Sequence, residues 1–398
     1  MKFVKTALAV AVALSAVAAS AQTANVTIYG GIRTNLEFAK YSSPTTSARI
    51  TSLENVSSRL GLRGSESLGG GMNAIFQIES GVGSDDGTGA IASREAWVGL
   101  NGGFGTVRLG YGLTAYDDVL GWAHHQGANS WENRNNGLSG GAGFAKQDLF
   151  TSYRGSAQCN SSAFDARYGN SLSYETPNFG GFSVRTQYAL IGESSSGSCT
   201  GFDTAFKYSN GPVRVGLAYA AHRNFSGIGG GASTGLITVK HNQDAIRVYG
   251  SFDAGVVKLD ASYEQARYKP AGVTLKYKYW DIGALAPLGA NTFGVQYSSR
   301  DKGLAALYDA ADRRLEVGGA VAAVPVTAGT LPLILAAWDQ GGGKHISFTH
   351  DYALSKRTTI RSYYTMLQNE ATAVGTSTIT FGGKTKINVI STGIWHSF

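Results

Sequence analysis

The sequence lacks features that mark several common classes of protein. Its 398 residues include only 2 cysteines and 7 prolines, and charged residues make up 15%. The two cysteines have no histidine or cysteine neighbours, so they make a poor metal site, and no cofactor is expected. Lysine and arginine alternate with acids along the chain instead of gathering in one patch, which argues against a nucleic-acid partner.

Long apolar runs are also missing, except near the start. Residues 7–19 form an apolar stretch that follows two lysines and ends in the small-x-small site Ala19-Ser20-Ala21, the pattern of a secretory signal peptide. A membrane anchor is the alternative, but this run is shorter than the ~20 residues of a spanning helix. We predict a signal peptide over 1–21 and a single exported domain over 22–398. Without the two signal lysines the net charge is (34 − 2) − 27 = +5, which is modest for this length.

The predicted export bears on the two cysteines. Cys159 and Cys199 each lie in a polar, serine-rich stretch. Because exported proteins can keep disulfides, we predict one disulfide between these residues, with two unpaired thiols as the alternative.

Glycine (54), tyrosine (20) and phenylalanine (17) are abundant, and apolar and polar residues alternate in about sixteen segments. In the segment 25–38, Val26 and Ile28 share one face, and Arg33 and Glu37 share the other. This period of two predicts strands. The same alternation recurs at 59–64, 182–190, 213–219, 246–253, 257–264 and 345–352. In the segment 274–288 it slips, because Lys276 and Lys278 have the parity of Trp280 and Ile282, and we expect a β-bulge there.

The connections between these segments alternate in length. Seven short turns separate eight mostly longer connections, which together join sixteen antiparallel strands. Nearly every strand carries one charged face. A soluble sandwich would pack its apolar faces together, turn these charged faces outward and need protected sheet edges. A closed barrel with lipid outside and water inside accounts for both faces, and sixteen strands leave an open channel. The longer connections are expected near 41–54, 83–91, 112–168, 191–201, 223–242, 269–272, 302–343 and 368–385.

Several motifs point to one family. They are "VTIYGGI", "SRLGLRGSESLGGGMNAIFQIE", "SREAWVGLNGGFGTVRLG", "YDDVLG", "NSLSYETPNFGGFS", "DYALSKRTTI" and the terminal "GIWHSF". With them the chain resembles the trimeric general porins of Gram-negative outer membranes, particularly the β-proteobacterial and neisserial type. The resemblance implies an all-β, 16-stranded antiparallel transmembrane β-barrel, a homotrimer, and contact with outer-membrane lipid and lipopolysaccharide. It also implies that Phe398 ends a signal that the barrel-assembly machinery reads, on a strand that closes the barrel.

The resemblance further implies a pore constriction. The connection 112–168 would be the third loop, folded into the lumen, although a loop lying over the barrel mouth is the alternative. Its acids would face inward-pointing arginines, and Tyr111 stands where relatives often have an arginine. The loop acids are Asp117, Asp118, Glu132 and Asp148, and the arginines are Arg33, Arg59, Arg63, Arg108 and Arg167.

An arginine row facing acids across water sets ion preference. Inward bases outnumber inward acids, so we predict a channel for passive diffusion of small hydrophilic solutes with a mild preference for anions. A substrate-selective channel is the main alternative, and an adhesin or structural barrel is a third interpretation. An enzyme is not expected, because the G-x-S-x-G match at 231–235 lacks a strand-to-helix elbow and the adjacent pair His124 and His125 lacks a third metal ligand.

Overall fold

The computed structural model describes residues 25–42, 44, 47–123, 164, 167–190, 199–225, 241–269, 275–300, 343–369, 373–375, 380–382 and 385–398. No helix within these ranges is long and apolar enough to cross a membrane. The predicted signal peptide, Glu132, Asp148 and Cys159 lie outside them, as does the histidine pair.

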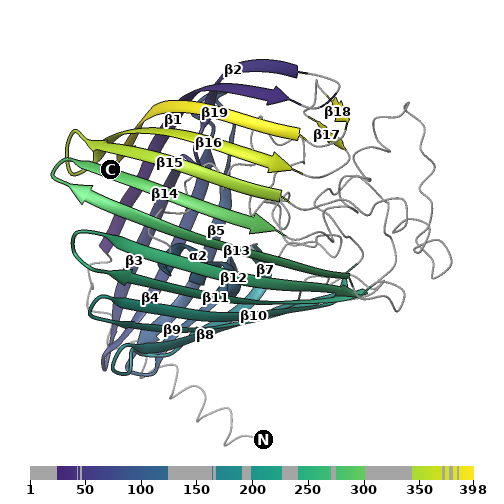
Figure 1. The fold of residues 1–398 in the computed structure, drawn as a ribbon. Helices are drawn as coiled ribbons and strands as arrows, with labels where there is room; N and C mark the ends of the chain where they lie inside the picture. Colours follow the sequence, from purple (N-terminus) through teal and green to yellow (C-terminus); the bar gives the residue numbers. More distant parts are fainter. Residues whose placement is uncertain are drawn as a thin grey trace, which may run out of the picture.

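The elements are mainly long strands (Figure 1). In chain order they are β1 (Asn25–Ser42), β2 (Ser47–Asn55), β3 (Arg59–Gly69), β4 (Met72–Val82), β5 (Gly89–Gly102), β6 (Gly105–Leu113), α2 (Ala115–Ala123), β7 (Arg167–Glu175), β8 (Phe182–Leu190), β9 (Thr200–Asn210), β10 (Val213–Phe225), β11 (His241–Asp253), β12 (Lys258–Lys269), β13 (Leu275–Leu288), β14 (Asn291–Arg300), β15 (Gly343–Ala353), β16 (Thr358–Asn369), β17 (Ala373–Gly375), β18 (Thr380–Gly382) and β19 (Thr385–Ser397).

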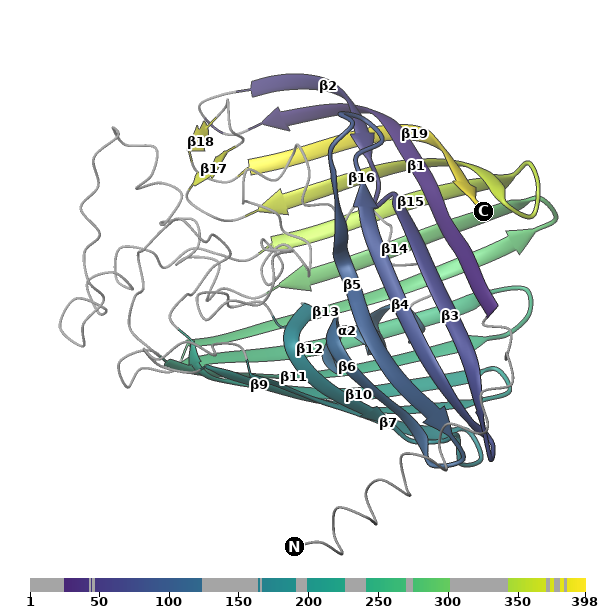
Figure 2. The same cartoon turned by 180° about the vertical axis from the view of Figure 1, so that it is seen from behind.

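The strands form one closed barrel. Every strand pairs antiparallel with its neighbours, and the last strand, β19, pairs with both β16 and β1. The sheet has 17 segments, but β2 and β3 pair successively along β1 and make up one strand, so the barrel has 17 − 1 = 16 strands. The predicted fold class is therefore confirmed (Figures 1 and 2).

The prediction of a loop at 41–54 is wrong. Instead, β1 continues to Ser42 and β2 pairs with it from Ser47 onward. The alternation continues through this hairpin, because Ala39 and Tyr41 on β1 lie inward, opposite Ile50 and Ala48 on β2. These apolar inward side chains pack against Ile387 and Val389 of β19, so the strand pair gains packing by extending.

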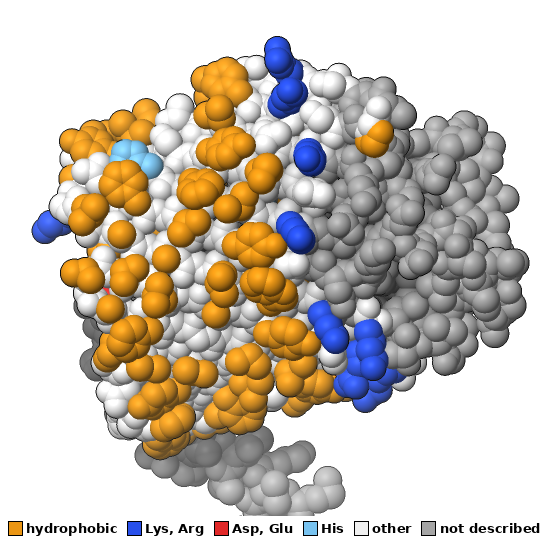
Figure 3. Space-filling model, viewed as in Figure 1, with side chains coloured by type: hydrophobic (Ala, Val, Ile, Leu, Met, Phe, Trp, Pro, Cys, Tyr) orange, Lys and Arg blue, Asp and Glu red, His pale blue; other side chains and the backbone are white. Residues whose placement is uncertain are grey.

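Side chains alternate between the two faces of the wall as the sequence predicts. On β1, Ile28 is 64% exposed on the outer face, whereas Asn35 and Glu37 are buried on the inner face. Apolar side chains cover the outer wall in a broad band (Figure 3). The bulge expected in 274–288 is wrong, because β13 pairs with β12 without a register shift. Lys276 and Lys278 consequently lie on the outer face with Trp280.

The helix α2 lies inside the barrel, at the start of the third loop (Figure 2). It contacts the inner face of the wall formed by β8 to β11. Small inward residues make room for it: a Cβ atom on Gly216 of β10 would stand 2.4 Å from Cγ1 of Val119, and Ala205 and Ala218 nearby are fully buried. The described part of the third loop therefore folds inward, as predicted.

Candidate pore constriction

Four of the arginines on the inner face of β1 to β7 form one group. Arg33 lies on β1, Arg59 on β3 and Arg167 on β7, and these three are among the residues predicted from the sequence. The fourth, Arg94 on β5, is within electrostatic range of all three. We call these four residues the arginine wall.

Arg94 is absent from the sequence prediction because strict alternation places it on the outer face. The backbone at Ala92 has a positive φ of 59°, and the pairing of β4 with β5 shifts between Glu79 and Gly81. This bulge turns Arg94 inward, where its Nε donates to Oε1 of Glu79 at 2.5 Å. A positive φ at an alanine has no sequence signal, so period-two reasoning could not have found this residue.

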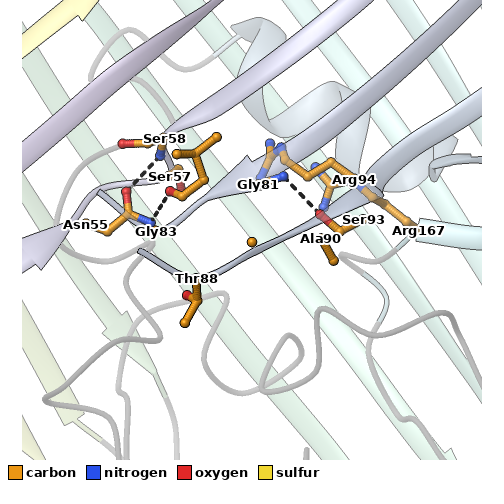
Figure 4. A pocket seen from close by; sticks show the side chains of 12 residues that line it. Asn55, Ser57, Ser58, Gly81, Gly83, Thr88, Ala90, Ser93, Arg94 and Arg167 are labelled. Atoms are coloured by element: carbon orange, nitrogen blue, oxygen red, sulfur yellow. Dashed lines mark hydrogen bonds between the residues drawn. The ribbon is translucent and has the colours of Figure 1, made fainter. Parts of the chain in front are cut away.

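Arg94 and Arg167 line a cavity of about 220 Å³ where the ends of β3, β4 and β5 meet (Figure 4). The rest of its lining consists mainly of glycines, hydroxyl groups and one amide. The lining residues are Asn55, Ser57, Ser58, Gly81, Val82, Gly83, Thr88, Gly89, Ala90, Ser93, Arg94 and Arg167. The two guanidinium groups and the hydroxyl groups of this lining suit a small polar or anionic solute.

The arginine wall carries an excess of positive charge. Glu79 accepts hydrogen bonds from Arg94 and from Tyr29, and Glu95 accepts from Gln77 and Trp97. Four guanidinium groups thus face two carboxylates on this wall, and Asp117 of α2 adds a third negative charge that acts on Arg167. In the described part of the chain, Nη1 of Arg33 and Nε of Arg167 are buried without a hydrogen-bond partner. Buried donors of this kind favour an anion or a polar solute nearby.

An ion-paired cluster beneath α2 adjoins the arginine wall, on β6 to β9. Asp118 of α2 accepts a hydrogen bond from Nζ of Lys207 at 2.8 Å and lies 3.7 Å from Arg185. Lys207 also contacts Glu175 at 3.0 Å, and Arg108 contacts the same carboxylate at 3.2 Å. Burial alone would raise the pKa of Asp118, but the two neighbouring cations hold that pKa below its ordinary value of 3.8. Asp118 is therefore a docking residue for α2.

A second buried contact fixes the start of α2 to the wall. The Arg247 side chain is 0% exposed and pairs with Glu264, which is 1% exposed. Nε of Arg247 donates to Glu264 at 2.6 Å, and the guanidinium lies 4.1 Å from the ring centroid of Tyr116. The Tyr116 hydroxyl donates to the same carboxylate at 3.0 Å. We call Tyr116, Arg247 and Glu264 the helix anchor.

The remaining predicted residues are distributed as follows. Arg63 stands apart from the arginine wall, exposed, with its guanidinium 5.1 Å from the Tyr29 ring centroid. Arg108 belongs to the ion-paired cluster, so it does not replace the arginine that relatives often have at the position of Tyr111. The Tyr111 hydroxyl donates to the Ser93 carbonyl. Asp117 acts electrostatically on Arg167.

Two further predicted residues lie away from the constriction. Cys199 is buried, and the described residues include no free cysteine. Its disulfide with Cys159 stays a prediction. Phe398 exchanges backbone hydrogen bonds of 3.2 Å with Gly30 at the junction of β19 and β1. Groups of three or more potential metal ligands are absent from the described ranges.

Comparison with known proteins agrees with this geometry. A family model described as Gram-negative porin matches residues 6–372. The chain is 30% identical over 316 residues to outer membrane porin protein 32 of Delftia acidovorans, covering 75% of this chain and 80% of that protein. It is 29% identical over 223 residues to major outer membrane protein P.IB of Neisseria meningitidis, covering 54% of this chain and 59% of that protein.

Among solved structures, an anion-selective porin from Comamonas acidovorans matches 94% of this chain and 100% of its own, with a TM-score of 0.67 and 26% identity. The predicted resemblance is thus confirmed. The chain belongs to the Gram-negative porin family, and it is an outer-membrane channel for passive diffusion of small hydrophilic solutes, not an enzyme.

Proposed function

We propose that this porin prefers anions and that the arginine wall sets the preference. The observation that carries the proposal is the excess of four guanidinium groups over Glu79, Glu95 and Asp117. Within the wall, Nη1 of Arg33 and Nε of Arg167 are buried without a hydrogen-bond partner among the described residues. Charges lining a pore attract permeating ions of opposite sign. Similarity to the anion-selective porin from Comamonas acidovorans supports the same preference here.

The test is the reversal potential across a salt gradient for the wild type, Arg94→Ala and the matched control Arg63→Ala. A unit charge about 7 Å from a permeating ion shifts its energy by about 0.3 kcal/mol in 0.1 M salt. The shift has opposite signs for anions and cations, so Arg94→Ala should lower the anion-to-cation permeability ratio by about threefold. Arg63→Ala removes the same charge outside the wall and should change the ratio less.

Equal ratios for the wild type and Arg94→Ala would refute the arginine wall as the source of selectivity. A tiny conductance that one particular solute blocks would favour the alternative function, a substrate-selective channel. Glu132 and Asp148 remain assigned to the third loop on the basis of the resemblance alone.

The mature protein is proposed to begin at Gln22. The charged start, the apolar stretch and the small residues up to Ala21 support removal of a signal peptide over 1–21. The mass of the protein purified from outer membranes tests this directly. A mass that includes residues 1–21 would refute the cleavage and the 22–398 domain boundary.

The outer wall supports the proposed homotrimer. Tyrosine and tryptophan belong to the aromatic girdles that contact lipid headgroups. None is exposed on β1 to β6, where the exposed residues are mainly Val, Ile, Leu and Met. Exposed tyrosine or tryptophan occurs on later strands, as Tyr174, Tyr188, Tyr219, Tyr263, Trp280, Tyr352 and Tyr364. A wall without a girdle suits contact with neighbouring subunits.

Cross-linking tests this arrangement. In the variant Leu60→Cys, the new cysteine lies on the outer face of β3 and should form cross-links between subunits in native membranes. The variant Tyr263→Cys, on β12, should not form them. The reverse result would refute this interface. Light scattering of the detergent-solubilised protein should give three times the monomer mass.

Phe398 is proposed to end the signal read by the barrel-assembly machinery. Its reciprocal backbone bonds with Gly30 support a role in closing the barrel as well. A ring-removing change, Phe398→Ala, keeps those backbone bonds, so it should slow assembly in cells while leaving the stability of the assembled barrel nearly unchanged. Normal assembly of this variant would refute the signal. Outer-membrane lipid and lipopolysaccharide are the proposed surroundings of the outer wall.

A further inference from the structure

Trp395 of β19 turns its indole ring to the inner face of the barrel, whereas Ile394 beside it is 60% exposed on the outer face. The strand lies between β1 and β16, and a guanidinium group from each of these neighbours lies against the ring. Arg361 of β16 is 4.2 Å from the ring centroid, and Arg33 of β1 is 5.1 Å from it. The face of an aromatic ring carries negative charge density and attracts cations at this range. We call Arg33, Trp395 and Arg361 the lumen stack.

The neighbouring residues fix the orientation of the indole. Its Nε1 donates to Oδ1 of Asn35 at 2.9 Å, and the Asn35 amide donates in turn to Oγ of Ser391 at 3.0 Å. Asn35 is 0% exposed, so water does not compete for these bonds. Gly393 stands opposite Asn35, and a Cβ atom on this glycine would stand 2.0 Å from Oδ1 of Asn35. The glycine therefore leaves room for the amide that holds the ring.

The two arginines of the lumen stack differ in what else holds them. Arg361 donates from Nε to Oδ1 of Asp351 at 2.5 Å and from Nη2 to the second oxygen of the same carboxylate, so its position does not depend on the ring. Arg33 forms no ion pair within the described ranges, and its Nη1 is buried there without a hydrogen-bond partner.

Repulsion also acts on Arg33. It belongs to the arginine wall, and it is within electrostatic range of Arg59, Arg94 and Arg361. Its backbone N–H is held by Oγ of Ser58 at 2.8 Å, but this bond does not direct the guanidinium. The Trp395 ring is therefore the contact that offsets the repulsion between the like charges.

We propose that Trp395 is a positioning residue for ion selectivity, because it holds the Arg33 guanidinium in one place on the lumen wall. The inference rests on the proposed function of the arginine wall and extends it to a residue without charge. A cation–π contact at a hydrated site favours the contacting rotamer by about two- to fivefold. Without the ring, the Arg33 charge would spread over several rotamers in water, where it is screened, and the wall would favour anions less.

The test is the reversal potential across a salt gradient for the full-length porin refolded in detergent. Trp395→Leu removes the ring and keeps the charge of the pore. Removal of a whole unit charge should lower the anion-to-cation permeability ratio by about threefold, so displacement of Arg33 should lower it by roughly twofold. Trp395→Phe keeps an aromatic face and should retain most of the wild-type ratio. The matched control Trp280→Leu makes the same change on the outer face of β13 and should leave the ratio unchanged.

A double-mutant cycle tests whether Trp395 acts through Arg33. Residues that act as one unit give non-additive effects, so adding Trp395→Leu to Arg33→Ala should cause no further fall in the ratio. A further fall of roughly twofold in that background would overturn the inference, because the ring would then act by another route. An unchanged ratio in Trp395→Leu alone would also overturn it.

Fluorinated tryptophans at position 395 provide a second test, which does not depend on the assembly of Trp395→Leu. They keep the shape of the ring and its N–H, but fluorine withdraws electron density from the ring face and weakens its attraction for a cation. A ratio that falls as fluorines are added would support the inference. A ratio that is independent of fluorination would overturn it, because the ring would then serve packing alone.

Arg94→Ala separates failure of this inference from failure of the proposed function. If Arg94→Ala lowers the ratio and Trp395→Leu does not, the arginine wall sets selectivity and only the role of Trp395 is refuted. If neither variant changes the ratio, the wall is not the source of selectivity and both proposals fail.

Discussion

The helix anchor offers a sharp test of what holds α2 in the lumen. In Glu264→Gln, the side chain keeps its shape but loses its charge. Arg247, which is 0% exposed, would then be a buried cation facing an amide. The Tyr116 hydroxyl would keep a hydrogen-bond acceptor, so the change isolates the charge from the packing.

The expected cost follows from the burial of the pair. Removing one partner of a buried ion pair typically destabilises by about 3–5 kcal/mol, because the other charge stays buried and uncompensated. The pair of Lys258 and Asp253 serves as the control, since its side chains are 37% and 36% exposed. Breaking an exposed pair of this kind costs about 0.2–1 kcal/mol, so Asp253→Asn should have a small effect.

The free energy of unfolding is measured in guanidinium for barrels refolded in detergent, together with single-channel recordings. Glu264→Gln should lower the unfolding free energy and add current fluctuations as α2 leaves the wall. The double variant Arg247→Met/Glu264→Leu should recover most of the stability, because it removes both charges of the pair. A loss in Glu264→Gln no greater than that in Asp253→Asn would refute the anchor.

Two further predictions concern the docking of α2, and a third concerns the cysteines. The lowered pKa of Asp118 means that its docking contributes stability above pH 3.8 and loses it as the pH falls below 3.8. Single-channel recordings should show the added noise only below that pH, and Asp118→Asn should show it at pH 7. Gly216→Val should push Val119 and α2 away from the wall, costing about 1–3 kcal/mol in the same unfolding assay. Thiol titration of the denatured protein should find no free cysteine, and reduction of the predicted disulfide should cost about 4 kcal/mol for a loop of roughly forty residues; two titratable thiols would contradict the pairing.

The alternation of residues predicted most of the fold. On β1 the assignment of Ile28 to the outside and Glu37 to the inside follows from polarity alone, because lipid and water impose opposite requirements on the two faces of one wall. The same requirement acts on every strand, so the strand number and the closure were predictable. The extension of β1 and β2 was not predictable. Its inward residues, such as Tyr41 and Ile50, are apolar, so they lack the polar character that marks the inner face of the other strands.

Two errors in predicting β-bulges bear on function. In β5 an unexpected bulge at Ala92 brings Arg94 into the lumen. In β13 an expected bulge is absent, and Lys276 and Lys278 stay on the outer face. The bulge turns Arg94 inward, whereas Val98 and Leu100 beyond it stay exposed on the outer face as alternation predicts. The sequence carries no signal for a positive φ at an alanine.

The position of Asp118 changes the expected origin of selectivity. The sequence suggests loop acids facing an arginine row across the water. Instead, Asp118 is bound to Lys207 and Arg185 on its own side, where it neutralises cations that would otherwise add to the positive lumen. Arg108 is neutralised by Glu175 in the same cluster. The three cations and two carboxylates under α2 leave one excess positive charge, and the arginine wall adds its own excess, so both groups should contribute to the field that a permeating ion meets. It follows that breaking the cluster with Asp118→Asn should increase anion preference, whereas a change in the wall should decrease it.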